Sequence, residues 1–129
     1  MLLQTYFNRI KEEFDRYATT RFVLNAQINF DLRPGDQGYL SGVIQFVNGA
    51  DLHFTEYVDV RKQNVDKLAY SYHFQDAGKN LIFRYDNAAH KPQLSSADHK
   101  HLPNQIIAAA MPQFNEVLAE IFLLNGWTQ

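Results

Sequence analysis

The feature that most constrains the fold is a long region in which apolar and polar residues alternate. From Arg21 to Asn87 the hydrophobic pattern has a period of two, which is typical of strands that bury one face. Turn signals divide this region at Pro34-Gly35, at Asn48-Gly49 and within the polar run 76–80. The connections are short and contain no helical pattern, so the strands are expected to form an antiparallel meander. We expect five strands, at about residues 22–30, 39–47, 51–61, 68–75 and 81–87.

Two amphipathic segments flank the predicted strands. In residues 2–18 apolar side chains recur three or four positions apart, and residues 112–124 carry a second such stripe. Pro112 suits the first turn of the second helix, and Asn125-Gly126 is a stop signal. The predicted fold class is α+β, a five-stranded antiparallel meander sheet with an N-terminal and a C-terminal helix, in a single domain over residues 1–129. If the helices cover one face of the sheet, the other face remains for a functional site.

The composition excludes several classes of protein. The 129 residues include no cysteine, which rules out disulfides, thiolate zinc sites and a cysteine nucleophile, and which fits a cytoplasmic protein. The first residues do not resemble a signal peptide, and no apolar run approaches the ~20 residues of a membrane span. The formal net charge of -2 counts against a nucleic-acid binder, although a local basic patch can exist on such a surface.

Side chains suited to proton transfer and anion binding concentrate between Tyr70 and Pro103, where four of the five histidines lie. Histidine is the usual proton carrier near neutral pH, and the arginine fork fits phosphate oxygens. Such groups can cleave RNA without a metal: a base takes the proton of a ribose 2′-OH, and an acid protonates the leaving 5′-oxygen. The candidate catalytic residues are His73, Arg84, His90, His99 and His101. The candidate substrate contacts are Glu56, Tyr72, Gln75, Tyr85, Asp86, Asn87 and Lys100.

Each of these residues also has a structural explanation. Tyrosines that alternate with polar residues usually pack in a core, and Arg84 and Asp86 could form an ion pair that shapes the end of the sheet. Glu56 lies among apolar residues of its strand, which suggests either a buried partner or a role in a site. A hairpin around residues 76–80 would place His73 opposite Phe83 or one step away. The sequence therefore does not decide whether His73 and Arg84 share a face.

Residues 88–104 show no clear period and contain two prolines, so we expect an irregular, functional loop there. Within it, His99 and His101 could chelate a metal together with His90 or Asp98, as in a hydrolytic zinc site. This pattern is a weak signal, because no further ligand motif accompanies it. No metal and no cofactor are expected.

The segments YSYHFQD, LIFRYDNAAHKP and HKHLP resemble the signature of the TumE family of prokaryotic toxin–antitoxin proteins. The resemblance covers most of the chain, including the first amphipathic helix with its Tyr6-Phe7 pair and the strand at 52–58. The matching positions are Glu56, Tyr72, His73, Gln75, Asp76, Arg84, Tyr85, Asp86, Asn87, His90, Pro92, His99, Lys100 and His101. The resemblance implies a small cytoplasmic toxin that is encoded beside its antitoxin and acts on RNA.

Three functions remain open. The leading hypothesis is a metal-independent, RNA-cleaving toxin, with a cognate antitoxin and RNA as partners and no membrane. The second is a non-enzymatic interaction module whose histidine-rich loop docks a partner chain. The third is a metal-dependent hydrolase that uses His90, His99 and His101. A homodimer is compatible with each of these hypotheses.

Overall fold

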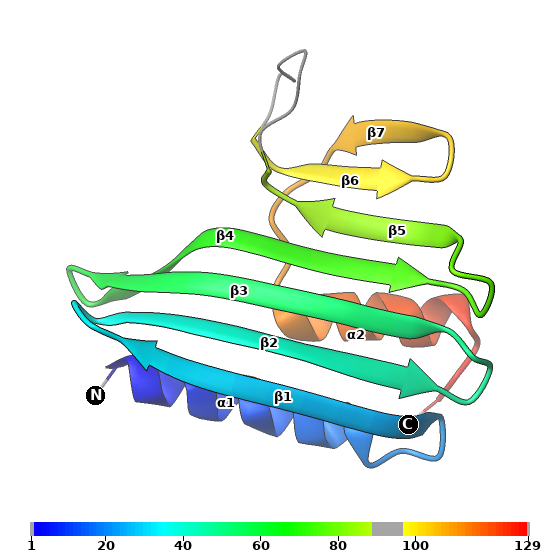
Figure 1. Ribbon diagram of the computed structural model, residues 1–129, viewed down its shortest axis with the longest axis horizontal. Coiled ribbons are helices and arrows are strands. Elements are labelled where there is room, and N and C mark those ends of the chain that lie inside the picture. The colour runs from blue at the N-terminus through cyan, green and yellow to red at the C-terminus, as the bar shows by residue number, and fades with distance from the viewer. Residues whose placement is uncertain (1, 89–96, 129) are drawn as a thin grey trace.

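The computed structural model describes residues 2–88 and 97–128, in which seven strands form one antiparallel sheet between two terminal helices (Figure 1). In chain order the elements are α1 (Leu2–Ala18), β1 (Val23–Arg33), β2 (Gln37–Phe46), β3 (Asp51–Arg61), β4 (Asn64–Gln75), β5 (Leu81–Asp86), β6 (His99–Leu102), β7 (Gln105–Ala108) and α2 (Phe114–Leu124). The strands follow one another across the sheet in chain order, which confirms the predicted α+β class, the meander and the two terminal helices. The predicted number of five strands is wrong, since the described residues form seven.

The two additional strands, β6 and β7, lie at the end of the segment that we expected to be an irregular loop and just beyond it. Each is only four residues long, which is too short for alternation to be recognised in a sequence. Pro103 lies in the turn between them, where its missing N–H costs no ladder hydrogen bond. β6 pairs with β5, with His101 opposite Arg84 and His99 opposite Asp86. The histidine segment therefore extends the sheet.

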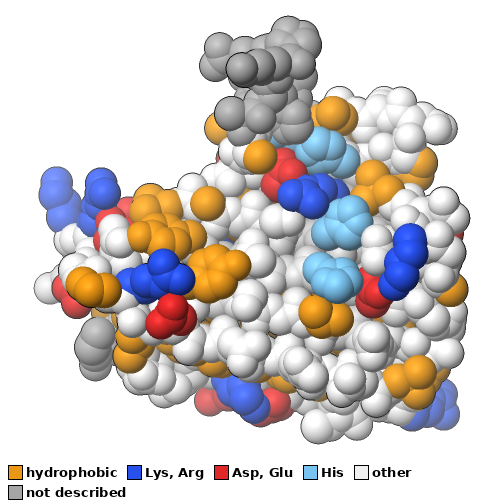
Figure 2. Space-filling view, viewed as in Figure 1, with side chains coloured by type: hydrophobic (Ala, Val, Ile, Leu, Met, Phe, Trp, Pro, Cys, Tyr) orange, Lys and Arg blue, Asp and Glu red, His pale blue; other side chains and the backbone are white. Residues whose placement is uncertain are grey.

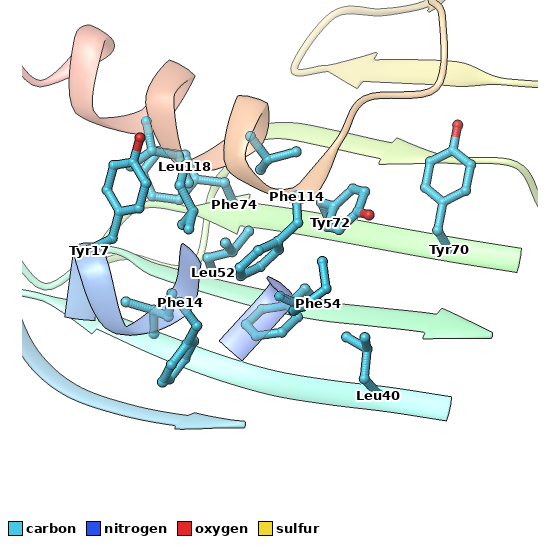
Figure 3. Close-up of a cluster of buried hydrophobic side chains, with 14 of the residues drawn as sticks. Phe14, Tyr17, Leu40, Leu52, Phe54, Tyr70, Tyr72, Phe74, Phe114 and Leu118 are labelled. Carbon is cyan, nitrogen blue, oxygen red and sulfur yellow. The ribbon is translucent and has the colours of Figure 1, made fainter. Parts of the chain in front are cut away.

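Both helices pack on the same face of the sheet (Figure 1). Their buried stripes are Leu3, Phe7, Ile10, Phe14 and Tyr17 in α1, and Phe114, Val117, Leu118, Ile121 and Phe122 in α2. Figure 3 shows how the helix side chains meet inward-facing residues of the central strands, among them Leu40, Leu52, Phe54 and Phe74. We call this side of the sheet the covered face and the opposite side the open face. Neither of the two described helices has the length and apolar character needed to cross a membrane.

α2 is set in place by local signals at both of its ends. The backbone N–H of Gln113 donates to Glu116 Oε1 at 2.7 Å as part of a capping box, directly after Pro112. The helix ends at Leu124 with Asn125 as its C-cap, and Gly126 follows with a φ of +67°, the left-handed conformation that glycine adopts at little cost. These boundaries place Glu120 of α2 against β5 and β6, where it accepts hydrogen bonds from Tyr85 and Lys100.

The register of β4 and β5 answers a question that the sequence left open. His73 pairs with Arg84, one residue away from the expected opposition with Phe83. The shift arises from an irregularity between Phe74 and Gln75, next to the turn that joins the two strands. Because directly paired residues point to the same side of a sheet, His73 and Arg84 share the open face.

Candidate functional site

The open face carries two rows of residues that cross all the described strands from β1 to β7. The first row consists of Gln27, Val43, His53, His73, Arg84, His101 and Ile106. The second row consists of Asn29, Ser41, Thr55, Ser71, Asp86, His99 and Ala108. Figure 2 shows this face, with histidine side chains gathered beside basic and acidic groups. The rows follow from the period of two, since residues two apart on a strand share a face.

Asp86 is the centre of the charged part of these rows. Its side chain is only 4% exposed, and its Oδ2 accepts a hydrogen bond from Arg84 Nε at 2.7 Å. Its Oδ1 lies 3.2 Å from His101 Nε2 and 3.8 Å from His99 Nδ1. Burial alone would raise the pKa of Asp86, but the hydrogen bond from Arg84 and the neighbouring His101 outweigh burial and lower it. The ionised carboxylate thus holds Arg84 in one orientation.

His73 lies between two partners that define its protonation pattern. Its Nε2 is 3.1 Å from Gln75 Oε1, an acceptor, so Nε2 carries the proton in this arrangement. Its Nδ1 is 3.5 Å from Arg84 Nη1, a donor, so Nδ1 offers a lone pair. When Nδ1 exchanges this long hydrogen bond for a substrate hydroxyl, it can accept a proton from a group bound to the guanidinium.

A hollow of about 470 Å³ lies on the open face next to His73 and Arg84. Its lining residues are Gln27, Asn29, Ser41, Gly42, Val43, His53, Phe54, Thr55, Ser71, His73 and Arg84. Small side chains at Ser41, Thr55 and Ser71 lie on this face and leave room for it. The side-chain amides of Gln27 and Asn29 are exposed on this face, while their backbones pair with β2. The hollow thus offers exposed hydrogen-bonding groups beside a basic group.

One histidine of this site was missed in the sequence. His53 on β3 pairs directly with His73 on β4 and lines the same hollow. Its Nε2 lies 3.2 Å from Asp51 Oδ1, and Lys79 Nζ lies 3.1 Å from the other oxygen of Asp51. The signal that could have identified it was the alternation of its own strand, which turns His53 away from the apolar neighbours Leu52 and Phe54.

The structure divides the predicted site residues between the two faces of the sheet. His73, Gln75, Arg84, Asp86, His99 and His101 lie on the open face, whereas Glu56, Tyr72, Tyr85 and Lys100 point to the covered face. On the covered face the Tyr85 hydroxyl and Lys100 Nζ donate to the two oxygens of Glu120, each at 2.6 Å. The side-chain amide of Asn87 binds the backbone of β4. It accepts a hydrogen bond from Tyr70 N–H at 3.2 Å and donates one to Leu68 C=O at 2.9 Å.

Glu56 is fully buried beneath α1 and has partners on both oxygens. The hydroxyls of Tyr6 and Tyr72 donate to it, and Lys67 Nζ lies 3.6 Å away. Burial, together with the Glu56 carboxylate, raises the pKa of Tyr72. Burial lowers the pKa of Lys67, although Glu56 acts in the opposite direction. This cluster ties the first helix to the sheet, out of reach of a ligand on the open face.

The expected metal ligand His90 lies outside the described residues. Within residues 2–88 and 97–128 no three His, Cys, Asp or Glu side chains are arranged to hold a metal ion. His99 and His101 point toward the Asp86 carboxylate, and His99 is 4% exposed. In the described residues these two histidines are therefore neighbours of Asp86.

Comparisons with known proteins agree with the resemblance seen in the sequence. No curated protein and no solved structure is similar enough to match the chain. A family model described as Toxin TumE matches residues 11–124, which include every described element from within α1 to the end of α2. With most of its length matched by that one model, and with the matching positions from Glu56 to His101 inside the match, the chain belongs to the TumE toxin family.

Proposed function

We propose that this toxin cleaves RNA without a metal, at the open face of its sheet. The observation that carries the proposal is the direct pairing of His73 with Arg84 on an uncovered face, beside an open hollow. A guanidinium binds a phosphate through two parallel hydrogen bonds, and an imidazole next to it can take a proton from a group attached to that phosphate. Membership in a family of toxins further implies an antitoxin as the partner chain.

The reaction would be a transesterification within the RNA backbone. His73 Nδ1 takes the proton of a ribose 2′-OH, and the 2′-oxygen forms a bond to the adjacent phosphorus. The bond from phosphorus to the 5′-oxygen breaks, and an acid supplies the proton that this oxygen needs. Arg84 stabilises the charge on the phosphate oxygens in the transition state. The products are a 2′,3′-cyclic phosphate and a 5′-hydroxyl end.

The neighbours of Arg84 act as positioning residues in this proposal. Asp86 lies almost buried below the guanidinium and fixes its direction. His99 and His101 lie on the other side of that carboxylate, at 3.8 Å and 3.2 Å from Asp86 Oδ1. Their exposure is low, at 4% and 17% of the side chain, so they face the carboxylate more than the solvent. The histidines of β6 would thus act through Asp86 and Arg84.

The net charge of -2 fits this site if RNA is held by local contacts. Arg84, His53, His73 and Lys79 supply positive or proton-donating groups on the open face. Gln27, Asn29 and Ser41 offer hydrogen bonds to an unpaired base that enters the hollow. We therefore favour single-stranded RNA over a duplex, whose bases cannot enter such a hollow.

The proposal is tested by incubating purified protein with RNA oligonucleotides in EDTA and analysing the product ends. Wild-type protein should leave 2′,3′-cyclic phosphates, and Arg84→Ala should lose about 10²–10³-fold in rate. Arg33→Ala is a matched control, because Arg33 Nε also binds an aspartate two residues away, Asp31, at 3.0 Å. Equal rates for the two arginine variants, or cleavage of an oligonucleotide that lacks 2′-hydroxyls, would contradict the proposal.

A second candidate is a non-enzymatic module whose histidine-bearing strand serves as a docking surface. The low exposure of His99 and the hydrogen bond from the Tyr70 hydroxyl to Asp98 at 2.7 Å favour a structural role for this segment. On this hypothesis, His73→Ala and Arg84→Ala lower the melting temperature and the purified protein leaves RNA intact. Melting curves recorded beside the cleavage assay distinguish the two functions.

A further inference from the structure

His53 has the position of a second proton-transfer group in the candidate site. It is directly opposite His73 on the neighbouring strand, and its side chain is 49% exposed. Among the described histidines, His53 and His73 are the two that line the hollow beside Arg84. Directly opposite side chains on antiparallel strands have Cβ atoms roughly 4.5–5.5 Å apart, so two imidazoles there can reach opposite sides of one phosphate.

Asp51 lies beside the ring of His53 on the same strand. The carboxylate of Asp51 is 6% exposed, and its Oδ1 lies 3.2 Å from His53 Nε2. This oxygen is buried and has no hydrogen-bond partner within the described residues, although His53 Nε2 lies close to it. Hydrogen bonds of catalytic groups are often poorly aligned before substrate binds. With Nε2 directed to the carboxylate, Nδ1 is the nitrogen left for a ligand.

The turn between β4 and β5 completes this arrangement. Asp76 Oδ1 accepts hydrogen bonds from the backbone N–H groups of Gly78 and Asn80, each at 2.9 Å, which fixes the turn. Lys79 then reaches Asp51 Oδ2 at 3.1 Å, so Asp51 is held from both sides. The titratable groups that face His53 are therefore Asp51 on its own strand, Lys79 from the turn and His73 from β4; its neighbour on β2, Val43, is uncharged.

The two facing histidines have opposite electrostatic neighbours. His73 faces the guanidinium of Arg84, whereas His53 faces the carboxylate of Asp51. A carboxylate beside one ring and a hydrogen-bond donor beside the other make the two imidazoles unequal partners for a phosphate that lies between them. Pairs of titratable groups in contrasting environments are the usual basis for dividing acid from base.

We propose that His53 is the general acid of the RNA cleavage reaction and that Asp51 is its positioning residue. The inference rests on the proposed function, in which His73 is the base. The proton on His53 Nδ1 passes to the leaving 5′-oxygen while the electron pair of the phosphorus–oxygen bond moves to that oxygen. His53 is then neutral, and His73 carries the proton of the 2′-OH. His73 releases a proton to water and His53 takes one up, which restores both groups for the next cleavage.

A substrate with a sulfur leaving group tests this assignment. In an RNA oligonucleotide with a 5′-bridging phosphorothiolate, the leaving thiolate needs no proton, so loss of the acid no longer matters. We expect His53→Ala to slow cleavage of ordinary RNA by about 10²–10⁴-fold and to cleave the phosphorothiolate at nearly the wild-type rate. His73→Ala should be slow on both substrates, because the base is needed for each.

Two further variants distinguish a positioning role of Asp51 from an effect of the substitutions on folding. Asp51→Asn keeps the shape of the side chain, and it should slow ordinary RNA cleavage less than His53→Ala and be restored by the phosphorothiolate. A purely structural role of Asp51 would impair both substrates alike. His53→Gln retains bulk at a half-exposed position, so its melting curve should match that of the wild type.

The outcomes separate this inference from the proposed function. Wild-type-like cleavage of ordinary RNA by His53→Ala, or equal loss on both substrates, would overturn the role of His53 and leave RNA cleavage standing. If the wild-type protein cleaves neither substrate, the proposed function fails and this inference fails with it.

Discussion

Two buried carboxylates, one on each face of the same sheet, are surrounded in contrasting ways. Glu56 on the covered face is fully buried and accepts hydrogen bonds from two tyrosine hydroxyls, with Lys67 nearby. Asp86 on the open face is 4% exposed and is surrounded by Arg84 and the histidines of β6. The first carboxylate is sealed by α1, whereas the second directs its arginine toward an open hollow.

This difference shows how one stretch of chain can serve two purposes. Tyr72 and His73 are neighbours in sequence, as are Arg84 and Tyr85, yet each pair points to opposite faces of the sheet. One member of each pair joins the packing under the helices, and the other joins the candidate site. A motif that spans both sets of residues therefore mixes groups that stabilise the fold with groups available to a substrate.

The largest effect on stability is expected from Glu56→Ala. This change leaves Lys67, which is 6% exposed, as a buried charge without its carboxylate partner. Breaking such a pair costs about 3–5 kcal/mol, so we expect a loss of that size in the free energy of unfolding, measured by denaturant titration. Glu12→Ala, at an exposed position of α1, is the control and should change stability little. A loss below about 1 kcal/mol would show that the covered face does not depend on this cluster.

The next largest effect is expected from alkaline pH, which should lower the free energy of unfolding through the tyrosines of the covered face. Burial and the Glu56 carboxylate raise the pKa values of Tyr6 and Tyr72. Because the unfolded tyrosines lose protons above about pH 10 while the folded ones keep them, stability is fully present below that pH and falls above it. Each such tyrosine contributes a slope of up to about 1.4 kcal/mol per pH unit.

Lys67 acts in the opposite direction. Its lowered pKa makes stability rise with pH up to about 10.5, the ordinary value, so the net decrease should become visible above that pH. Equilibrium unfolding of wild type and Tyr72→Phe between pH 9 and about pH 11.5 measures these slopes. The variant should show the shallower decrease; an equal slope would mean that Tyr72 ionises normally in the folded state.

A smaller loss of stability is expected from a change at the contact between the covered face and α2. Lys100 donates to Glu120 at 2.6 Å. Burial lowers the pKa of Lys100, but its interactions with Glu120 and Tyr85 together outweigh burial and raise it. Lys100→Ala should cost about 1 kcal/mol of stability, because a charge-assisted hydrogen bond at a partly exposed position is lost. The rate of RNA cleavage per folded molecule should stay at the wild-type value. A large loss of cleavage rate at unchanged stability would show that Lys100 takes part in the candidate site.

The sequence predicted much of this fold because its signals are local. The period of two and the period of 3.6 identified five strands and both helices, and the third strand matches β3 from Asp51 to Arg61. β6 and β7 were missed because four-residue strands around Pro103 carry too little pattern. Which face of the sheet Lys100 and His101 point to could not be predicted without knowing that β6 exists.

The candidate site was predictable in its residue types but only partly in its grouping. Alternation already placed Tyr72 and His73 on opposite faces, and it also placed His53 on the polar side of its strand. The contact between His73 and Arg84 depended on a shift at Phe74 and Gln75, which no local signal marks. Pairing across strands, which depends on such irregularities, decides which of the many polar residues meet.

The most direct test of the central claim compares two adjacent residues of β5. Arg84 points to the open face, and Tyr85 points to the covered face, where its hydroxyl donates to Glu120 at 2.6 Å. We would measure single-turnover cleavage of a single-stranded RNA in EDTA by wild type, Arg84→Ala and Tyr85→Phe. We expect Arg84→Ala to lose about 10²–10³-fold in rate and Tyr85→Phe to retain the wild-type rate. An equal loss in both variants, or a greater loss in Tyr85→Phe, would contradict the assignment of the activity to the open face.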